Sequence, residues 1–512
     1  MISLNLTFTN LFLTSLTFFL LYFIYKFYIL PLLRIQYYTK QGAKRIFHWK
    51  LLAYIDNYRN AAKRGDFYYN YKKVLEKHPK TRVIVENFAS RPYLALVDLE
   101  MVKEAWKRHE IYQKDPYPFA LIMELAGGTT IFAEEAAWKK GRRVISSAFN
   151  YEFLKNIVPM IMETTQEKFQ ELIKEKELKD VNLLEKLAGI TGEITARFFF
   201  GKRFHGRTIF GVPMTTVVHR QLNMLFMEAL SLPYIVFGPR LVKANILKKH
   251  KELNKGIVEI RRKCLEMIEE TEKSNKKEDN LLGVLLDLRR SGDVQDRLTD
   301  DQIVGEFLGL FGAGTDTTSH LVNSAIYFLW KYKEIYEKVK EEVDREFGNM
   351  EDLSIEKINK MEYMNAFLKE TLRLGGPTTA YFFRAPVKDD NLCGMNIKKG
   401  TIVNFHPDLY YSSEEFFPNH KEFRPERWLE GNSHEQNALK AEPYAFIPFS
   451  AGPRNCVGQH LAMIEARIII GLFIKTFKFE FPRDYQLKMV KRFLYEPFDP
   501  LMVTLEPLVG KD

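Results

Sequence analysis

The chain begins with a long uncharged stretch. No charged side chain occurs from Met1 to Tyr25, and residues 11–25 (LFLTSLTFFLLYFIY) are almost entirely apolar. As a helix, residues 4–25 would extend about 33 Å, enough to cross the hydrocarbon core of a bilayer. Basic residues follow on the C-terminal side only: Lys26, Arg34, Lys40, Lys44 and Arg45. The positive-inside rule therefore predicts a membrane anchor with its N-terminus outside and the body in the cytosol. A cleaved signal peptide is the alternative, but no basic stretch precedes the apolar run and no small-residue cleavage site follows it.

The remaining pattern predicts a mainly helical body. Residues 144–340 carry apolar positions at three- and four-residue spacing, which is typical of helices. Polar segments at 272–280 and 289–297 are interpreted as surface loops. Short β-prone runs occur at residues 81–97, 401–405 and 501–505, so distant segments are expected to contribute small sheets. One large mixed domain fits this pattern better than the three or four domains that the length alone suggests.

Composition and charge exclude several classes of protein. The 512 residues are 46% hydrophobic and 14% aromatic, which excludes a disordered chain. Residues 1–80 hold 13 basic and three acidic residues, and their net charge of +10 equals that of the whole chain. A basic excess confined to the N-terminal end favours a membrane surface over nucleic acid. The three cysteines form no CxxC pair, so a zinc ribbon is excluded and a cysteine used singly, as a nucleophile or metal ligand, stays open.

The most specific chemistry surrounds Cys456, in the stretch FSAGPRNCVG (449–458), which precedes a predicted helix. A thiolate that binds iron needs a tight glycine-bearing turn, N–H donors near the sulfur and a helix N-terminus. Gly458 permits a close approach, Arg454 can pair with a carboxylate, and Phe449 can shield the sulfur. An ordinary buried cysteine in a turn is the alternative.

This stretch matches the FxxGxRxCxG haem-binding signature, and the chain resembles the cytochrome P450 family. Three further motifs occur in the family's order, and with the anchor and a closing strand at 501–505 the resemblance covers essentially the whole chain. It implies a mainly α fold with small β-sheets after one N-terminal transmembrane helix. The expected division is an anchor and linker at residues 1–33 and a haem domain at 34–512.

The first of these motifs lies in a predicted helix of about thirty residues. Thr299 and Gln302 can form a capping box at the N-terminus of this helix. Gly305, Gly309, Ala313 and Thr317 are four residues apart and form a stripe of small side chains. A helix–helix contact is the alternative reading of this stripe. The resemblance to the AGxDT oxygen-activation motif implies that Gly309 and Ala313 face the haem, while Asp316 and Thr317 are catalytic.

Two further motifs are less specific, and both are expected to support the loop that carries Cys456. Glu370 and Arg373 share one helix face, and PERW (425–428) follows later. The resemblance implies a buried structural cluster of Glu370, Arg373 and Arg427. Trp138 and Arg142 match the family's WxxxR motif, in which both side chains contact a haem propionate. By the same analogy, Arg384 is a third candidate for contact with a propionate. His320 and His406 are expected to be packing or surface residues.

The resemblance implies a haem-thiolate monooxygenase that uses haem b, with Cys456 as the axial iron ligand. The site residues that bind the cofactor would be Trp138, Arg142, Gly309, Ala313, Arg384, Phe449, Arg454, Cys456 and Gly458. Two alternatives stay open: a haem-thiolate isomerase or dehydratase acting on peroxides, and a non-catalytic haem-binding membrane protein. Ala313 stands where some fatty-acid hydroxylases carry a haem-linked glutamate, so covalent haem attachment is not expected.

Expected partners follow from the same resemblance. NADPH-cytochrome P450 reductase would dock on a basic patch of Lys139, Lys140 and Arg143, with Arg454 and the lysines of 331–340 contributing. By analogy with the family, the substrate pocket is expected in residues 112–132, 221–237, 378–382 and 493–498 and near Phe307 and Phe311. Their apolar composition predicts a lipophilic small molecule, and residues 232–237 are expected to dip into the bilayer. The predicted location is the endoplasmic reticulum membrane, with a single span and the catalytic domain facing the cytosol.

Overall fold

The structure is a computed structural model. It describes residues 2–46, 68–88, 90–115, 120–126, 128–175, 177–229, 231, 233–234, 238–274, 278–291, 297–348, 353–378, 383–429, 433–491 and 494–508. The chain divides into two compact units, each made of two segments. The small unit combines Met1–Asp115 with Ala380–Leu409, and the large unit combines Pro116–Thr379 with Tyr410–Asp512.

A six-stranded sheet forms the centre of the small unit, with the strand order β1-β2-β3-β11-β8-β4. The strands are β1 (Lys44–Arg45), β2 (Val83–Phe88), β3 (Arg91–Leu96), β4 (Tyr112–Lys114), β8 (Arg384–Pro386) and β11 (Ile402–Phe405), with a separate hairpin of β9 (Asp390–Leu392) and β10 (Met395–Ile397). β2 and β3 pair antiparallel, and β11 pairs parallel to β3 with Ile402 opposite Tyr93. The expected strands at 81–97 and 401–405 are therefore confirmed and lie in one sheet.

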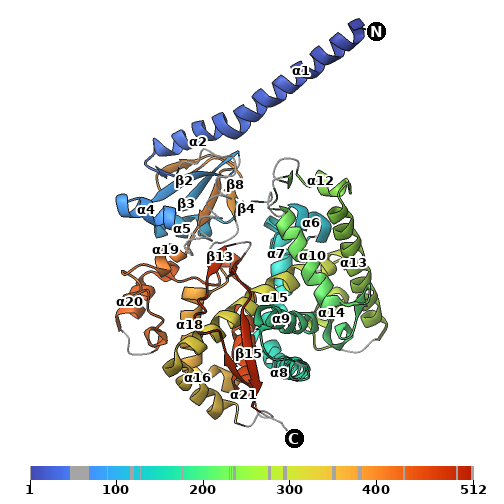
Figure 1. Cartoon of the computed structure of the whole chain (residues 1–512), viewed down its shortest axis with the longest axis vertical. Coiled ribbons are helices and arrows are strands. Elements are labelled where there is room, and N and C mark those ends of the chain that lie inside the picture. Colours follow the sequence, from blue (N-terminus) through green and yellow to red (C-terminus); the bar gives the residue numbers. More distant parts are fainter. Residues whose placement is uncertain are drawn as a thin grey trace. The chain divides into compact units, whose positions relative to one another are not determined.

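The N-terminal helices belong to this unit: α1 (Ile2–Ile24), a π-helical turn (Tyr25–Ile29) and α2 (Leu30–Thr39). Ile35 and Tyr38 of α2 are buried, and Tyr38 Oη lies 2.6 Å from Thr401 Oγ1 beside β11. α1 continues from α2 beyond the sheet (Figure 1), and its large apolar side chains from Leu11 to Ile24 are mostly exposed. Asn10–Thr39 is long and apolar enough to cross a membrane. The other helices of the unit are α4 (Tyr69–Lys77) and α5 (Leu99–Lys107).

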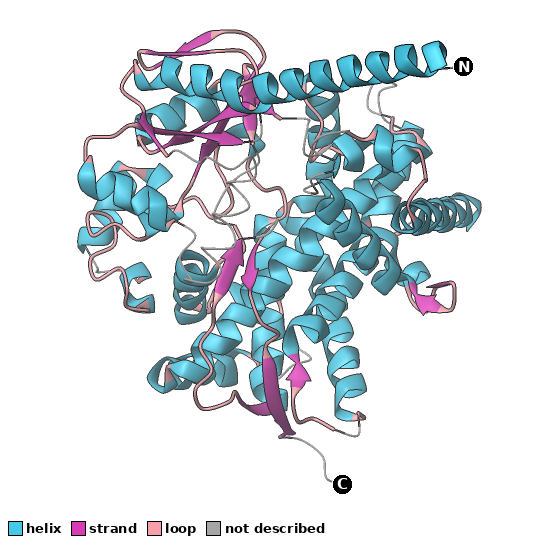
Figure 2. Ribbon diagram, turned by 45° about the horizontal axis from the view of Figure 1, so that its top comes forward, coloured by secondary structure: helices cyan, strands magenta, loops and turns pink. Residues whose placement is uncertain are grey.

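The large unit is mostly helical, with short strands beside its helices (Figure 2). Its helices are α6 (Ala120–Ala126), α7 (Glu135–Ser146), α8 (Tyr151–Ile173), α9 (Leu183–Phe200), α10 (Met214–Ala229), α12 (Arg240–Lys243), α13 (Lys248–Ser274), α14 (Leu281–Ser291), α15 (Asp300–Lys331), α16 (Lys333–Glu346), α17 (Ile355–Asn359), α18 (Glu362–Gly375), α20 (Ser433–Ala441) and α21 (Gln459–Thr476). Its strands are β5 (Val181–Asn182), β6 (Thr208–Ile209), β7 (Val212–Pro213), β12 (Phe477–Glu480), β13 (Met489–Lys491), β14 (Tyr495–Pro497) and β15 (Met502–Pro507). β15 pairs with β12 and β5, which confirms a closing strand.

The long helix α15 runs through the large unit. Its capping box is confirmed, because Thr299 Oγ1 accepts the Gln302 N–H while the Gln302 side chain accepts the Thr299 N–H. Its aromatic side chains Phe307 and Phe311 are 0% and 1% exposed, and Phe307 packs edge-on against Phe199 and Phe200 of α9. These two rings therefore lie in the core, and a substrate pocket near them stays a prediction.

Helix ends differ from the sequence pattern in two places. α13 continues to Ser274 and α14 continues to Ser291, so the loops expected from residues 272 and 289 begin later. Polar residues such as Glu272 and Arg289 are helical and pair with each other at 3.1 Å. The two histidines are buried as expected: His406 Nε2 lies 2.7 Å from Tyr93 Oη, and His320 Nε2 lies 3.9 Å from Glu496.

Candidate active site

The loop that carries Cys456 is a compact turn in front of α21. The Cys456 N–H donates to Phe449 O at 2.9 Å, and the Asn455 N–H donates to Gly452 O at 3.1 Å. Gly452 (φ +69°) and Ser450 (φ +62°) both adopt the left-handed conformation, which glycine accepts at little cost. α21 begins at Gln459, so Cys456 lies three residues before the helix N-terminus, as the motif predicts.

One backbone donor and one positive charge act on the sulfur of Cys456. The residue is accessible to solvent, yet the loop atoms packed around the sulfur raise the pKa of the thiol above its ordinary value. A backbone hydrogen bond from Gly458 and the positive charge of Arg142 act in the opposite direction and lower this pKa. A Cβ atom added at Gly458 would lie 4.0 Å from Sγ, so the glycine lets the backbone approach closely. These donors favour the thiolate form.

Helix α7 is tied to the Cys456 loop through two arginines. Arg142 donates from Nη1 to Asn455 O at 2.8 Å and from Nη2 to Asn455 Oδ1 at 2.7 Å. The Arg454 guanidinium lies 3.9 Å from the ring centroid of Trp138, donates to Ala133 O at 2.7 Å and pairs with Glu134. Burial lowers the pKa of both guanidinium groups. The expected carboxylate partner of Arg454 is therefore Glu134, and Trp138, Arg142 and the loop form one assembly.

The glycines of α15 have two different roles. A Cβ at Gly314 would lie 2.8 Å from Thr195 Oγ1 of α9, and one at Gly312 would lie 3.3 Å from Leu222 of α10. These two positions, which lie outside the stripe of Gly305, Gly309, Ala313 and Thr317, serve helix packing. Gly309 lies under Thr129, whose Oγ1 would be 2.2 Å from an added Cβ.

Beyond the contact between Gly309 and Thr129, one face of α15 remains accessible to solvent. Gly309 and Thr317 are partly accessible and Ala313 is exposed, whereas Gly305 at the start of the stripe is buried. Thr317 Oγ1 donates to Ala313 O at 2.6 Å. The structure thus leaves a narrow strip of small groups ending in a hydroxyl.

Asp316 has a partner that no motif indicates. Its Oδ1 lies 2.7 Å from His219 Nε2 of α10, and both side chains are partly buried. This hydrogen bond is the largest cause of a raised pKa at His219. The two residues are 97 positions apart, and a single histidine in a helical stretch gives no signal in the sequence.

A buried carboxylate, Glu306, lies ten residues before Asp316 in α15. Glu306 accepts hydrogen bonds from the Thr130 N–H at 2.8 Å, from Thr130 Oγ1 at 2.5 Å and from Thr129 Oγ1 at 3.3 Å. Burial raises the pKa of Glu306 to about 7. A Cβ at Gly141 would lie 1.8 Å from Thr130 Oγ1, so the glycine between Trp138 and Arg142 lets α7 approach this cluster.

The cluster expected around Glu370 is confirmed. Glu370 is fully buried and accepts from Arg373 Nη2 at 2.7 Å, Arg427 Nε at 3.0 Å, the Arg424 N–H at 3.0 Å and Trp428 Nε1 at 2.9 Å. Arg373 also donates to the backbone oxygens of residues 411, 420 and 422. One carboxylate therefore joins α18 to the segment that precedes the Cys456 loop.

Other expected residues belong to the small unit or lie outside the described residues. Arg384 belongs to the small unit, where it donates to Tyr112 O at 2.9 Å and lies over the ring of Trp106. Its expected role toward a propionate stays a prediction. Of the expected pocket segments, residues 116–119, 127, 230, 232, 235–237, 379–382 and 493 lie outside the described residues.

The expected docking patch is smaller than the sequence indicates. Lys139 and Arg143 are exposed on α7, and Lys140 donates to Arg297 O at 2.8 Å. Arg454 is 3% exposed in its side chain and is neutralised by Glu134. Lys333, Lys338 and Lys340 pair with Glu480, Glu426 and Asp344. Arg454 is therefore not part of an exposed basic patch, whereas the contribution of the lysines of 331–340, of which Lys331 is exposed, stays a prediction.

Comparison with known proteins agrees with this geometry. The family model described as Cytochrome P450 matches residues 51–503. Cytochrome P450 CYP72A219 of Panax ginseng is 29% identical over 407 residues, which cover 77% of this chain and 76% of the relative. The 7-deoxyloganic acid hydroxylase of Catharanthus roseus is 27% identical (82% and 79% covered), and Cytochrome P450 4c21 of Blattella germanica is 23% identical (85% and 87%). The chain belongs to the cytochrome P450 family, which consists of haem-thiolate enzymes, and is a P450 monooxygenase.

Proposed function

We propose that this chain inserts one atom of O₂ into a lipophilic organic substrate, with the Cys456 thiolate as axial ligand of haem b. A C–H bond of the substrate becomes C–OH, the second oxygen atom leaves as water, and two electrons and two protons are consumed. The observation that carries the proposal is the Cys456 turn, with its Gly458 donor and its position before α21.

The residues present fit a haem group. The Cys456 sulfur is a single soft ligand in an accessible position, and the α15 strip presents only small groups. The buried Arg454 Nε has no hydrogen-bond partner among the described residues, which suits an anionic propionate near Trp138, Arg142 and Arg454. When bound, haem supplies the iron centre that activates O₂. Phe449 and Gly458 would flank the sulfur within the loop, and the exposed Ala313 would face the haem from α15.

Thr317 and Asp316 handle protons in this proposal. Thr317 Oγ1 holds a proton that it donates to Ala313 O, and rotation of its side chain aims that proton along the accessible face. Asp316 lies next to it in the chain and reaches toward α10, where His219 is partly exposed. This arrangement gives a path for protons from solvent to the strip.

Electrons are proposed to come from NADPH through NADPH-cytochrome P450 reductase. The exposed residues Lys139 and Arg143 on α7, the helix that contacts the Cys456 loop, support docking of an acidic partner on this side. The apolar helix α1, with basic residues only after it, supports a single span in the endoplasmic reticulum membrane with the catalytic body in the cytosol.

The test uses the purified holoprotein with reductase, NADPH and ¹⁸O₂ against a panel of lipids, sterols and terpenoids. We expect a product that carries one ¹⁸O atom and depends on NADPH. Cys456→Ala is expected to lose bound haem and the long-wavelength Soret band of the ferrous–CO complex. Cys264→Ser and Cys393→Ser are matched controls that keep both.

Two results would contradict the proposal. Loss of the Soret band in a control variant with retention in Cys456→Ala would refute the ligand assignment. Conversion of a lipid peroxide without NADPH and reductase, with no ¹⁸O incorporation from O₂, would indicate an isomerase instead.

A further inference from the structure

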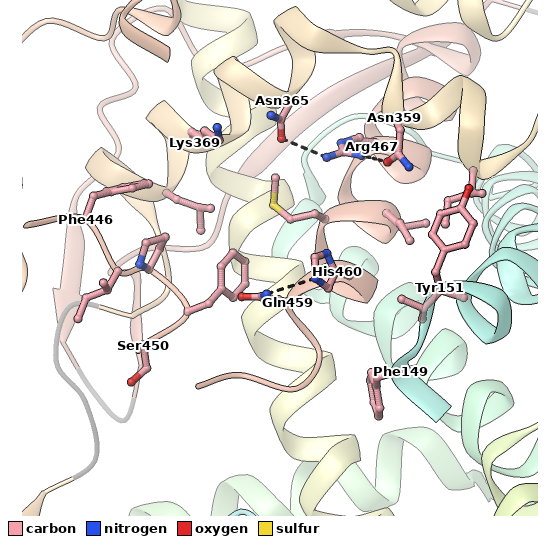
Figure 3. Close-up of a pocket in the computed structure, with 18 residues that line it drawn as sticks. Phe149, Tyr151, Asn359, Asn365, Lys369, Phe446, Ser450, Gln459, His460 and Arg467 are labelled. Carbon is pink, nitrogen blue, oxygen red and sulfur yellow. Dashed lines mark hydrogen bonds between the residues drawn. The ribbon is translucent and has the colours of Figure 1, made fainter. Parts of the chain in front are cut away.

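A cavity of about 650 Å³ lies behind the Cys456 loop in the large unit (Figure 3). It is bounded by the starts of α8 and α21, by α17 and α18, and by residues 446–450 of the loop. The residues that line it are Phe149, Tyr151, Leu154, Ile355, Asn359, Asn365, Lys369, Leu372, Phe446, Ile447, Pro448, Phe449, Ser450, Gln459, His460, Met463, Ile464 and Arg467. This volume is in the range of pockets that hold small organic ligands.

The charged lining of this cavity is entirely basic. Arg467 and Lys369 are its cations, His460 is a third basic group, and no aspartate or glutamate is among the described residues that line it. Figure 3 shows Asn365, Arg467 and Asn359 side by side on one wall, with Lys369 on the same side as Asn365. A cavity with this lining is electrostatically suited to an anion.

Arg467 is a buried cation held by neutral groups. The residue is 9% exposed, and it donates to Asn359 Oδ1 at 3.2 Å, Asn365 Oδ1 at 3.1 Å and the Ile358 carbonyl at 3.5 Å. Its Nε has no hydrogen-bond partner among the described residues. A buried guanidinium normally has a carboxylate partner, because desolvation of an unpaired charge is costly.

The nearby carboxylates do not fill that role. The charge of Glu342 acts on Arg467, but its two oxygens accept the N–H groups of Tyr363 and Met364 at the start of α18. Glu465 of α21 is buried, burial raises its pKa to about 8, and among the described residues it is not one of the hydrogen-bond acceptors of Arg467. The positive charge at the cavity is therefore only partly compensated.

Lys369 adds a second positive charge. Its side chain lies between burial and exposure, with Nζ 5.9 Å from the ring centroid of Trp428. Burial, and then the charge of Arg467, lower the pKa of Lys369. Two cations that repel each other in a partly dry cavity gain more from a bound anion than exposed lysines would.

The remaining walls are apolar. Leu154, Ile355, Leu372, Met463 and Ile464 come from four helices and contribute aliphatic or thioether groups. A small inorganic ion would leave these walls without contacts, whereas an aliphatic chain would cover them.

We propose that this cavity binds an amphipathic organic anion, with its head group at Arg467 and Lys369 and its aliphatic chain along the apolar walls. A fatty-acid carboxylate and a lipid phosphate monoester share this chemistry. The ligand would contact Phe449 and Ser450, and thereby the loop that carries Cys456. The site is separate from the accessible strip of α15, and its occupancy does not depend on turnover.

The test measures binding of sodium dodecanoate to the purified holoprotein by calorimetry, after clotrimazole has saturated the substrate side of the haem. We expect one dodecanoate per chain, and binding at least roughly tenfold weaker for neutral dodecanol. Lys369→Met is expected to weaken dodecanoate binding roughly tenfold or more, whereas Arg467→Lys is expected to keep most of it. Lys360→Met is the matched control, because Lys360 is exposed at the end of α17 and does not line the cavity.

Dodecyl phosphate serves as the second arm of the test. Tighter binding than dodecanoate would assign the cavity to lipid phosphates, and weaker binding would assign it to fatty acids. Absence of binding in clotrimazole-saturated protein, or equal affinity of wild type and Lys369→Met, would overturn the proposal. An equal loss in Lys360→Met would also overturn it, because general surface charge would then explain the binding. If dodecanoate does not bind but Lys369→Met raises the KM for reductase, the cavity belongs to a protein docking surface instead.

Discussion

The imidazole of His219 and the carboxylate of Asp316 form a hydrogen-bonded pair, with Nε2 and Oδ1 2.7 Å apart. His219 lies on α10 and Asp316 on α15, next to Thr317. The Asn223 amide lies 3.2 Å from the same imidazole nitrogen. The hydrogen bond holds the Asp316 carboxylate toward α10. Because its partner is histidine rather than lysine or arginine, the net charge of the pair depends on pH.

The first prediction concerns this pair and pH. The hydrogen bond to Asp316 raises the pKa of His219 above its ordinary value near 6.5. The charged pair should therefore be complete below pH 6.5 and lost as pH rises through the raised pKa. We expect the ratio of product to NADPH consumed to fall over that alkaline range in wild type. In His219→Gln the ratio should be lower at every pH and should not fall further over this range. In His219→Arg the ratio should stay high at alkaline pH.

The measurement is the pH profile of that ratio between pH 6 and 9. Identical profiles for wild type and His219→Arg would show that the pair has no part in proton delivery. A merely structural role for His219 would lower haem content in His219→Gln without changing the shape of the profile.

The second prediction concerns the hydroxyl of Thr317. Thr317→Ala removes the donor at the end of the accessible strip while keeping a small side chain. Loss of one well-placed donor commonly costs about 10²-fold in the step that it serves. We expect the variant to keep haem and consume NADPH, but to release hydrogen peroxide in place of most product. Thr317→Ser keeps the hydroxyl and should restore coupling, and an unchanged ratio in Thr317→Ala would make Thr317 a packing residue.

The third prediction concerns electron transfer. Lys139→Glu/Lys140→Glu should weaken turnover supported by reductase and leave turnover driven by hydrogen peroxide intact. The effect should shrink at high salt, because exposed charges are screened within about 8 Å at physiological ionic strength. Lys248→Glu/Lys251→Glu on α13 makes the same change in charge at exposed positions and should have little effect. Equal losses in both turnover assays would indicate misfolding rather than impaired docking.

The fourth prediction concerns stability. Glu370→Gln leaves Arg373 and Arg427 buried without their carboxylate. Removal of one partner from a buried charged cluster typically costs about 3–5 kcal/mol in the free energy of unfolding. We expect early loss of haem on heating and a lowered midpoint of unfolding. Glu362→Gln on the exposed side of α18 is the control, and a midpoint equal to that of Glu362→Gln would contradict the cluster's structural role.

Much of the architecture was predictable because it depends on local pattern. The capping box at Thr299 and Gln302, the strands near Val83 and Ile402, and the turn before Gln459 each follow from residues close together in the chain. The pairing of Glu370 with Arg427 required the family resemblance, since the two residues are 57 positions apart. The two motifs are short and unspecific by themselves, and only their occurrence in the family's order indicated that they form one cluster.

What the sequence did not indicate depends on tertiary packing. Phe307 and Phe311 are aromatic on a helix next to the site, but their faces pack into α9 and its neighbours. Helical period alone does not say which neighbour covers which face. In the same way, nothing local marks His219 as the partner of Asp316, or Thr129 and Thr130 as the donors to Glu306. Glu426, the acidic partner of Lys338, lies 88 positions away along the chain and gave no local signal either.

The strand order of the small unit has a consequence for synthesis of the chain. β3 pairs with β11, although about 300 residues separate Leu96 from Ile402. At the ribosome's rate of roughly 5–20 residues per second, β3 waits about 15 to 60 seconds for its neighbour. During that interval the apolar helix α1 has already emerged, while the β3 edge has no strand to pair with. An unpaired strand edge is prone to aggregation, so we expect the nascent chain to require protection of β3, by a chaperone, until β11 has been made.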